Sequence, residues 1–155
     1  WEGERHIQSI LPKHIIIRTS WLYSRYGNNF VKTMLRLAET KTTLNVVSDQ
    51  IGTPTNACDL AEGIMQVISK QVLLEKNNET VVLYGTYHFS NEGACSWYDF
   101  AQKIFDVNKI NIDLRPISTS GYPTPAERPM YSVLDKAKIK TAFGIQINSW
   151  EESLK

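Results

Sequence analysis

The sequence has few cysteines and no long apolar run. Only Cys58 and Cys95 occur among its 155 residues, which excludes a disulfide-rich scaffold and a zinc site with four cysteine ligands. Because free thiols are typical of a reducing compartment, we expect a cytoplasmic location. No apolar stretch approaches the roughly 20 residues that a membrane-spanning helix requires. The charged first residues, Trp1 to Arg5, give no indication of a signal peptide.

The sequence also lacks an excess of either charge. Lys and Arg number 17 and Asp and Glu number 16, which gives a net charge of +1. This balance argues against a nucleic acid or an anionic membrane as the main partner. Hydrophobic residues make up 42% and charged residues 21%, which is typical of one globular domain with a buried core.

A third absence concerns glycine. The eight glycines never occur with the Gly-x-x-Gly-x-x-Gly spacing that cradles the pyrophosphate of a dinucleotide. The chain nevertheless contains several polar and aromatic motifs that are typical of a ligand pocket, such as Arg18-Thr19-Ser20-Trp21 and Arg128-Pro129. We therefore expect a binding pocket without a cofactor-binding turn.

The hydrophobic pattern predicts alternating strands and helices. The run Ile15-Ile16-Ile17 is typical of a strand buried on both faces of a parallel sheet. Strands are expected at 14–18, 44–47, 87–90 and 114–117, with a further extended segment at 81–83. Helices are expected over 2–11 and after the capping residues Asn29, Asn56 (paired with Asp59), Ser96, Asp135 and Ser149. Polar loops are expected at 75–80 and 118–129. The alternation indicates an α/β fold, and the small number of strands indicates a sheet without all its neighbours.

Several motifs occur in an order that resembles the dTDP-4-dehydrorhamnose reductase family, which belongs to the extended short-chain dehydrogenase/reductases. They are Ile17-Arg18-Thr19-Ser20-Trp21, Asn28-Asn29-Phe30-Val31, Val47-x-Asp49-Gln50-x-Gly52-x-Pro54-Thr55, Asp59-Leu60-Ala61, Tyr87-His88-Phe89-Ser90, Ser96-Trp97-Tyr98-x-Phe100-Ala101, Arg128-Pro129-x-x-Ser132-x-Leu134-Asp135 and Phe143-Gly144-Ile145. The resemblance covers nearly the whole chain. It implies the C-terminal part of such an enzyme, namely the last strands and helices of a Rossmann-type sheet plus a small α+β substrate-binding domain. Residues 1–20 and 49–90 would be remnants of the Rossmann-type domain, and residues 21–48 and 91–155 would form the substrate-binding domain.

The resemblance also implies an activity for the full-length protein. Such enzymes reduce dTDP-4-dehydro-L-rhamnose to dTDP-L-rhamnose, a precursor of cell-envelope polysaccharide, with hydride from NADPH or NADH. Their catalytic Tyr-x-x-x-Lys pair does not occur in this sequence. Because Gly3-Glu4 matches a pair that follows it in the family, the Tyr and Lys are expected just upstream of Trp1. The chain alone is therefore expected to be inactive. Some members are associated with Mg²⁺, although no cluster of carboxylates indicates a site here.

Four residues are the candidates for binding a dTDP-sugar. Trp21 follows a strand end and can stack on a sugar or donate a hydrogen bond, although it could also be a core residue. Asn29 could face a phosphate or hydroxyl at a helix N-terminus, or act only as a cap. Gln50 can hold a sugar or base edge, whereas the neighbouring Asp49 is expected to stabilise the turn. Arg128 suits a diphosphate because of its planar fork of donors, the alternative being a solvated surface side chain.

Other conspicuous residues are expected to be structural. Trp97 and Trp150 lie on helical apolar stripes, which predicts core positions. Arg18 is expected in an ion pair. The lysines Lys136, Lys138 and Lys140 are expected on a solvated helix face, and Cys58 and Cys95 are expected to be buried thiols.

Two other functions remain open on the sequence. The regulatory β subunit of methionine adenosyltransferase shares the expected fold and works by binding a partner enzyme. A self-standing interaction domain without a ligand is the third hypothesis. In every case apolar surface is expected where the rest of the sheet would pack, and such a surface could support a homodimer.

Overall fold

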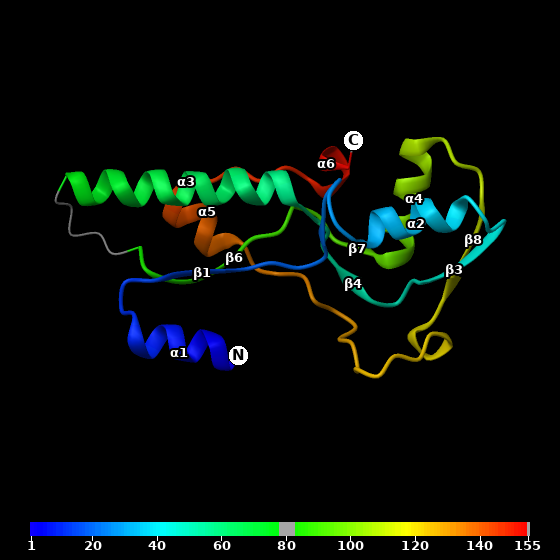
Figure 1. The fold of residues 1–155 in the computed structure, drawn as a ribbon, viewed down its shortest axis with the longest axis horizontal. Coiled ribbons are helices and arrows are strands. Elements are labelled where there is room, and N and C mark those ends of the chain that lie inside the picture. The colour runs from blue at the N-terminus through cyan, green and yellow to red at the C-terminus, as the bar shows by residue number, and fades with distance from the viewer. Residues whose placement is uncertain (78–82, 155) are drawn as a thin grey trace.

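The computed structural model describes residues 1–77 and 83–154. One part of it is built on two parallel strands, β1 (Ile15–Arg18) and β6 (Gly85–His88). This strand pair lies between α1 (Glu2–Ile10) on one side and α3 (Ala57–Lys76) with α5 (Ala137–Phe143) on the other (Figure 1). Apolar side chains from β6, α3, α5 and the segments that flank them form one buried cluster, called the sheet cluster here: Val67, Tyr87, Phe89, Ile139, Phe143 and Ile145.

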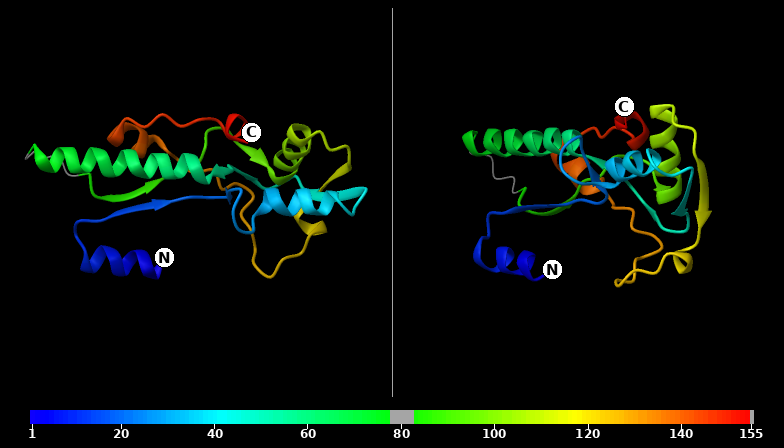
Figure 2. Two further views of the ribbon diagram at one scale, coloured as in Figure 1. Left: turned by 45° about the horizontal axis from the view of Figure 1, so that its top comes forward. Right: turned by 45° about the vertical axis from the view of Figure 1, so that its right-hand side comes forward.

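The other part of the molecule contains the second pair of longer strands. Here β3 (Thr43–Val47) and β8 (Asp113–Ile117) run parallel to each other, and α2 (Phe30–Ala38) and α4 (Trp97–Asn108) pack beside them (Figures 1 and 2). Apolar side chains of α2, β3 and α4, together with residues of β2, β7 and the C-terminal segment, form a second buried cluster, called the helix cluster here. Its buried members are Tyr23, Met34, Val46, Cys95, Phe100, Ala101, Ile104, Phe105, Trp150 and Leu154.

Very short strands lie between the two parts. Strand β2 (Leu22–Tyr23) pairs in parallel with β5 (Thr55–Asn56), and β4 (Ile51–Gly52) pairs antiparallel with β7 (Cys95–Ser96). A 3₁₀ turn, η1 (Thr119–Gly121), follows β8, and α6 (Trp150–Ser153) is the last helix. The α/β arrangement predicted from the sequence is therefore confirmed.

The helix starts agree well with the sequence pattern. Asn29 caps α2 by accepting from Lys32 N, and Asn56 caps α3 by accepting from Cys58 N. Capping boxes begin α4, at Ser96 with Asp99, and α6, at Ser149 with Glu152. Gly144 ends α5 with a φ of 71°, as the left-handed cap requires. Local hydrogen-bonding chemistry thus sets where these helices begin and end.

Three expectations about individual helices and strands are wrong. Asp59 does not pair with Asn56 at the start of α3, because its carboxylate accepts hydrogen bonds from Asn91 and Ser153. The residues of β1 are partly exposed, since β6 is the one strand that pairs with β1 in the described structure. Helix α3 runs to Lys76, into the loop expected at 75–80. The rest of that loop, from residue 78, and all but Leu83 of the extended segment expected at 81–83 lie outside the described residues.

The two thiols have different surroundings. Cys95 is buried as expected, and burial raises the pKa of its thiol to about 12. Cys58 is exposed, contrary to the expectation, because it lies in the first turn of α3 on the side away from the core.

Apolar side chains are exposed on α1 and α3. On α1, Ile10 is 77% exposed and Ile7 is also open to solvent, as is Leu11 directly after the helix. On α3, the exposed apolar side chains are Ile64, Met65, Ile68, Val72 and Leu73. None of the helices within residues 1–77 and 83–154 is both long enough and apolar enough to cross a bilayer.

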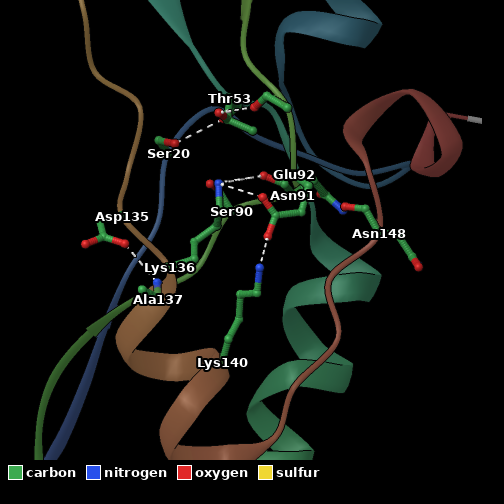
Figure 3. A network of polar contacts seen from close by, with 11 residues as sticks. Ser20, Thr53, Ser90, Asn91, Glu92, Asp135, Lys136, Ala137, Lys140 and Asn148 are labelled. Carbon is green, nitrogen blue, oxygen red and sulfur yellow. Dashed lines mark hydrogen bonds and ion pairs between the residues drawn. The ribbon is translucent and has the colours of Figure 1, made fainter.

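Lys136 corrects the expectation of a solvated lysine face. Its side chain is 8% exposed, and Nζ donates to the carbonyl oxygen of Asn91 at 3.2 Å and lies 3.5 Å from Glu92 (Figure 3). Lys140 approaches the same carboxylate at 2.9 Å from the solvent side. An ammonium group can be buried only beside a partner, and the partners of Lys136 come from the loop after β6. The spacing of lysines along one helix could not predict them.

Candidate functional site

The loop after β1 places Trp21 at the junction of the two parts. Ser20 Oγ donates to the carbonyl of Thr53 at 3.0 Å, and Thr55 Oγ1 donates to the carbonyl of Ser20 at 2.7 Å. The backbone N–H of Thr55 donates to the carbonyl of Trp21 at 3.2 Å. Thr53 and Thr55 are fully buried, so these bonds are shielded from water. They hold Trp21 at a φ of 46°, a left-handed backbone that costs a non-glycine residue roughly 1–2 kcal/mol.

An aromatic stack continues from Trp21 into the helix cluster. The rings of Trp21 and Trp97 are stacked, with centroids 3.5 Å apart and planes 13° from parallel. Phe30 packs on Trp97 at 4.7 Å with its ring tilted by 48°. Trp97 was expected in the core, and it is partly buried against the helix cluster, but it also lines the cavity described below. Helical spacing does not distinguish a core face from a cavity wall, so the sequence pattern did not predict the second role.

Asp49 and Gln50 both reach the start of the loop after β8. The Asp49 carboxylate accepts from the backbone N–H of Thr119 at 2.9 Å and from its hydroxyl at 2.7 Å. These bonds hold the pKa of the Asp49 carboxyl below its usual value, so it is ionised at neutral pH. Gln50 Nε2 donates to the same hydroxyl at 3.1 Å. Asp49 therefore has a structural role as expected, but its side chain fixes the loop after β8 and not the turn before Gly52 and Pro54.

The proline-containing loop that carries Arg128 is fixed at both ends. Thr119 is tied to Asp49 at its start. At its end, Ile51 N donates to the carbonyl of Met130 and Ser132 N donates to the carbonyl of Ile51, both at 2.8 Å. The loop therefore returns to β4, and Arg128 comes near residues that lie almost eighty positions earlier in the sequence.

These segments line one cavity of about 740 Å³, which is open to solvent on one side. Trp21, Gln50 and Arg128 all line it, so three of the four residues predicted from the sequence share one hollow. Arg128 is the one charged side chain among the described residues that line it. A hollow with one cation and no acidic side chain is suited to an anionic ligand but not to proton transfer by a carboxylate.

Asn29 is placed differently. It is not among the residues that line the cavity, and its side chain is occupied by its cap: Oδ1 accepts from Lys32 N at 3.2 Å and Nδ2 donates to the carbonyl of Ser24 at 2.6 Å. The capping alternative is thus confirmed, whereas a contact with the ligand stays a prediction. Arg18, expected in an ion pair, forms one with Glu4 of α1.

Sequence reasoning missed most of the apolar wall of the cavity. The missed apolar residues come from α2, β3 and the start of α4: Phe30, Met34, Leu37, Leu44, Val46 and Trp97. The missed polar ones, apart from Asn45 and Thr33, lie in or beside the loop after β8: Tyr122, Thr124 and Ser132. The Arg-Pro-x-x-Ser motif was the one signal that could have found Ser132. Within the described residues, no group of three or more His, Cys, Asp or Glu side chains could hold a metal ion.

Comparison with known proteins agrees with the geometry. A family model described as "RmlD substrate binding domain" matches residues 1–155. A dTDP-4-dehydrorhamnose reductase of Aggregatibacter actinomycetemcomitans is 49% identical over 160 residues, which cover 99% of this chain and 53% of that protein. The chain therefore spans about half the length of the curated relatives it matches.

Two solved structures are similar over the same extent. A dTDP-4-dehydrorhamnose reductase from Clostridium acetobutylicum superposes with a TM-score of 0.87 and 45% identity, covering 99% of this chain and 51% of that one. A dTDP-4-dehydrorhamnose reductase from Bacillus anthracis, solved in complex with NADP, gives a TM-score of 0.80 and 42% identity, covering 98% of this chain and 50% of that one. The α/β fold is thus that of the C-terminal part of an extended short-chain dehydrogenase/reductase. The chain belongs to the RmlD substrate-binding domain family and corresponds to the C-terminal half of dTDP-4-dehydrorhamnose reductases.

Proposed function

We propose that this chain is the sugar-nucleotide-binding portion of a reductase that converts dTDP-4-dehydro-L-rhamnose to dTDP-L-rhamnose. The observation that carries the proposal is the single cavity that Trp21, Gln50 and Arg128 share. Its volume, its largely apolar wall and its one cation are suited to a nucleotide diphosphate joined to a deoxysugar. The family membership of the chain supports the same substrate class.

Each lining residue has a proposed role in that complex. Arg128 binds the diphosphate through its planar fork of donors. Gln50 retains acceptor capacity at its amide oxygen after donating to Thr119, and offers it to the ligand. Trp21 contacts the sugar end of the cavity at the carboxyl end of β1, where open α/β sheets bind ligands. For Asn29 we propose an indirect role, in which it fixes the start of α2 beside the cavity.

The chemistry of hydride transfer requires groups outside these residues. A reduced nicotinamide supplies the hydride, and the relative from Bacillus anthracis was solved with NADP. The residues of this chain do not fit a cofactor site, because they contain neither the glycine turn nor the Tyr-x-x-x-Lys pair. We propose that such a site belongs to the other half of a full-length protein, with residues 1–20 and 49–90 as the neighbouring part of the Rossmann-type sheet. Helix α5 contributes to the sheet cluster and therefore packs with the Rossmann-type part. The domain boundaries expected from the sequence had placed α5, within residues 91–155, in the substrate-binding domain.

Replacing Arg128 with alanine tests the proposed site. We expect wild-type chain to bind dTDP more tightly than about 1 mM and the variant to bind at least about tenfold more weakly, because one charge-assisted hydrogen bond contributes about 1.5–3 kcal/mol. Isothermal titration calorimetry with dTDP measures both. Arg115→Ala is the matched control, since Arg115 is exposed, pairs with Asp113 and lies outside the cavity. Binding of dTDP weaker than millimolar by the wild-type chain would favour an interaction domain without this ligand.

The isolated chain is expected to show no turnover. Incubated with NADPH and dTDP-4-dehydro-L-rhamnose, it should leave the nicotinamide absorbance unchanged. The reason is that no tyrosine in the sequence is followed by a lysine four positions later, so the chain lacks the proton-transfer pair. Nicotinamide oxidation that scales with the concentration of purified chain would contradict this expectation. A homodimer through the exposed faces of α1 or α3 and a cytoplasmic location stay predictions.

A further inference from the structure

The indole of Trp21 is in close contact with a glycine. A Cβ placed on Gly52 would lie 2.6 Å from both Cε2 and Cζ2 of Trp21, with Ser132 Oγ next at 3.0 Å. These two ring atoms are bonded to each other, and the indole nitrogen bonded to Cε2 is farther away. Only a position above the ring gives equal short distances to both carbons and a longer one to the nitrogen. The α-carbon of Gly52 therefore faces the benzo end of the indole, and any larger residue would displace it.

Trp97 covers the opposite face of the same indole. With centroids 3.5 Å apart and planes nearly parallel, the two rings overlap almost completely. If Gly52 lay on the same side of the indole as Trp97, a Cβ built on Gly52 would have Trp97 atoms among its nearest neighbours. None of the three nearest atoms belongs to Trp97, so Gly52 lies on the other side. Gly52 and Trp97 thus enclose Trp21 between them. A ligand ring has no access to the Trp97 side and only restricted access to the other.

The polar edge of the indole remains available. Trp21 Nε1 makes no hydrogen bond to any residue within 1–77 and 83–154, and it is not among the buried polar atoms that lack a partner there, which are Tyr23 Oη and Gln71 Oε1. The N–H is therefore open to solvent, on a residue that lines the cavity. An indole nitrogen is a donor only, so it can bind an acceptor oxygen of a ligand.

We propose that Gly52 and Trp97 are positioning residues that clamp Trp21, so that its indole serves the nucleotide sugar as a hydrogen-bond donor and not as a stacking platform. The proposal rests on the proposed function for the identity of the ligand, but the clamp itself does not. Gly52 is not among the residues that line the cavity, so its effect on binding passes through its neighbours, of which Trp21 is met first at 2.6 Å and Ser132 next at 3.0 Å. The left-handed backbone of Trp21 agrees with an orientation that the surrounding contacts impose.

The first experiment follows the four indole N–H resonances of the ¹⁵N-labelled chain, one for each tryptophan. Trp→Phe variants assign them. In Gly52→Ala the Trp21 resonance should move towards that of a denatured indole, because the added methyl group expels the ring from its stack on Trp97. Two controls bracket this result. Gly3→Ala adds a Cβ that meets nothing within 4 Å, and Gly63→Ala adds one that meets Phe89 at 2.6 Å, away from the cavity.

The second experiment measures binding of dTDP-L-rhamnose by calorimetry. Trp21→Phe keeps a ring against Trp97 but lacks the N–H, and we expect at least about tenfold weaker binding. Gly52→Ala should lose at least about as much. Gly3→Ala adds a Cβ that meets nothing within 4 Å and lies outside the cavity, so its affinity should stay within about threefold of wild type. On adding the ligand to wild-type chain, the Trp21 N–H should shift and become protected from exchange with water.

The outcomes separate the parts of the proposal. An unmoved Trp21 resonance in Gly52→Ala, or the same movement in Gly63→Ala, would overturn the clamp. Wild-type affinity in Trp21→Phe would overturn the donor role and favour stacking. If wild-type chain binds neither dTDP-L-rhamnose nor dTDP, the proposed function fails, while the resonances of the free chain still decide whether the clamp exists.

Discussion

Replacing Asn91 with alanine is expected to lower the free energy of unfolding by about 3–5 kcal/mol, because several buried polar groups lose their partner at once. Asn91 is fully buried. Its Oδ1 accepts from Asn56 N at 2.8 Å, and its Nδ2 donates to Ser153 Oγ at 3.0 Å, to the carbonyl of Asn148 at 3.2 Å and to the Asp59 carboxylate. One side chain thereby joins the start of α3 to the C-terminal segment.

Urea unfolding followed by far-ultraviolet circular dichroism measures this loss. Asn28→Ala is the matched control, since that asparagine is exposed, and it should change stability by less than about 0.5 kcal/mol. An Asn91→Ala chain within about 1 kcal/mol of wild type would contradict the expectation and would mean that water replaces the lost amide.

Phe100→Ala is expected to cost about 3–5 kcal/mol of stability, the usual range for removing a fully buried ring. Phe100 is 0% exposed at the centre of the helix cluster. Its ring lies 5.4 Å from Tyr23, 5.5 Å from Phe30 and 5.8 Å from Trp150, measured between centroids. These three residues come from β2, α2 and α6, so the void would loosen three segments together.

Two variants on the same helix calibrate the Phe100 result. Phe100→Leu keeps most of the apolar volume and should cost less than Phe100→Ala. Val107→Ala changes a residue that is 41% exposed and should cost less than about 1 kcal/mol. If the alanine variants at 100 and 107 had equal stability, the helix cluster would not be the core described above.

Local chemistry explains what the sequence could predict of the fold. The caps at Asn29, Ser96 and Ser149 need only residues within one turn, so the pattern located them correctly. Lys136 and Asp59 were misjudged because their partners come from distant segments, Glu92 for the first and Asn91 for the second. Spacing along one helix carries no information about such partners.

The candidate site was predictable to a similar extent. The family motifs named Trp21, Gln50 and Arg128, which the fold brings to one cavity. They could not show that Trp97 lines the cavity as well as packing against the core that holds Trp150, because both tryptophans lie on apolar helical stripes and only the packing separates them. The ligand contacts of the four predicted residues stay predictions that the binding experiments address.

The attachment of the Arg128 loop at Thr119 and at Met130 to Ser132 has a thermodynamic consequence. A segment whose two ends are already held has lost much of its conformational entropy before any ligand arrives. The entropy cost of ordering Arg128 around a diphosphate is then smaller than it would be for a free chain end. A larger share of the free energy of the contacts therefore remains as binding affinity.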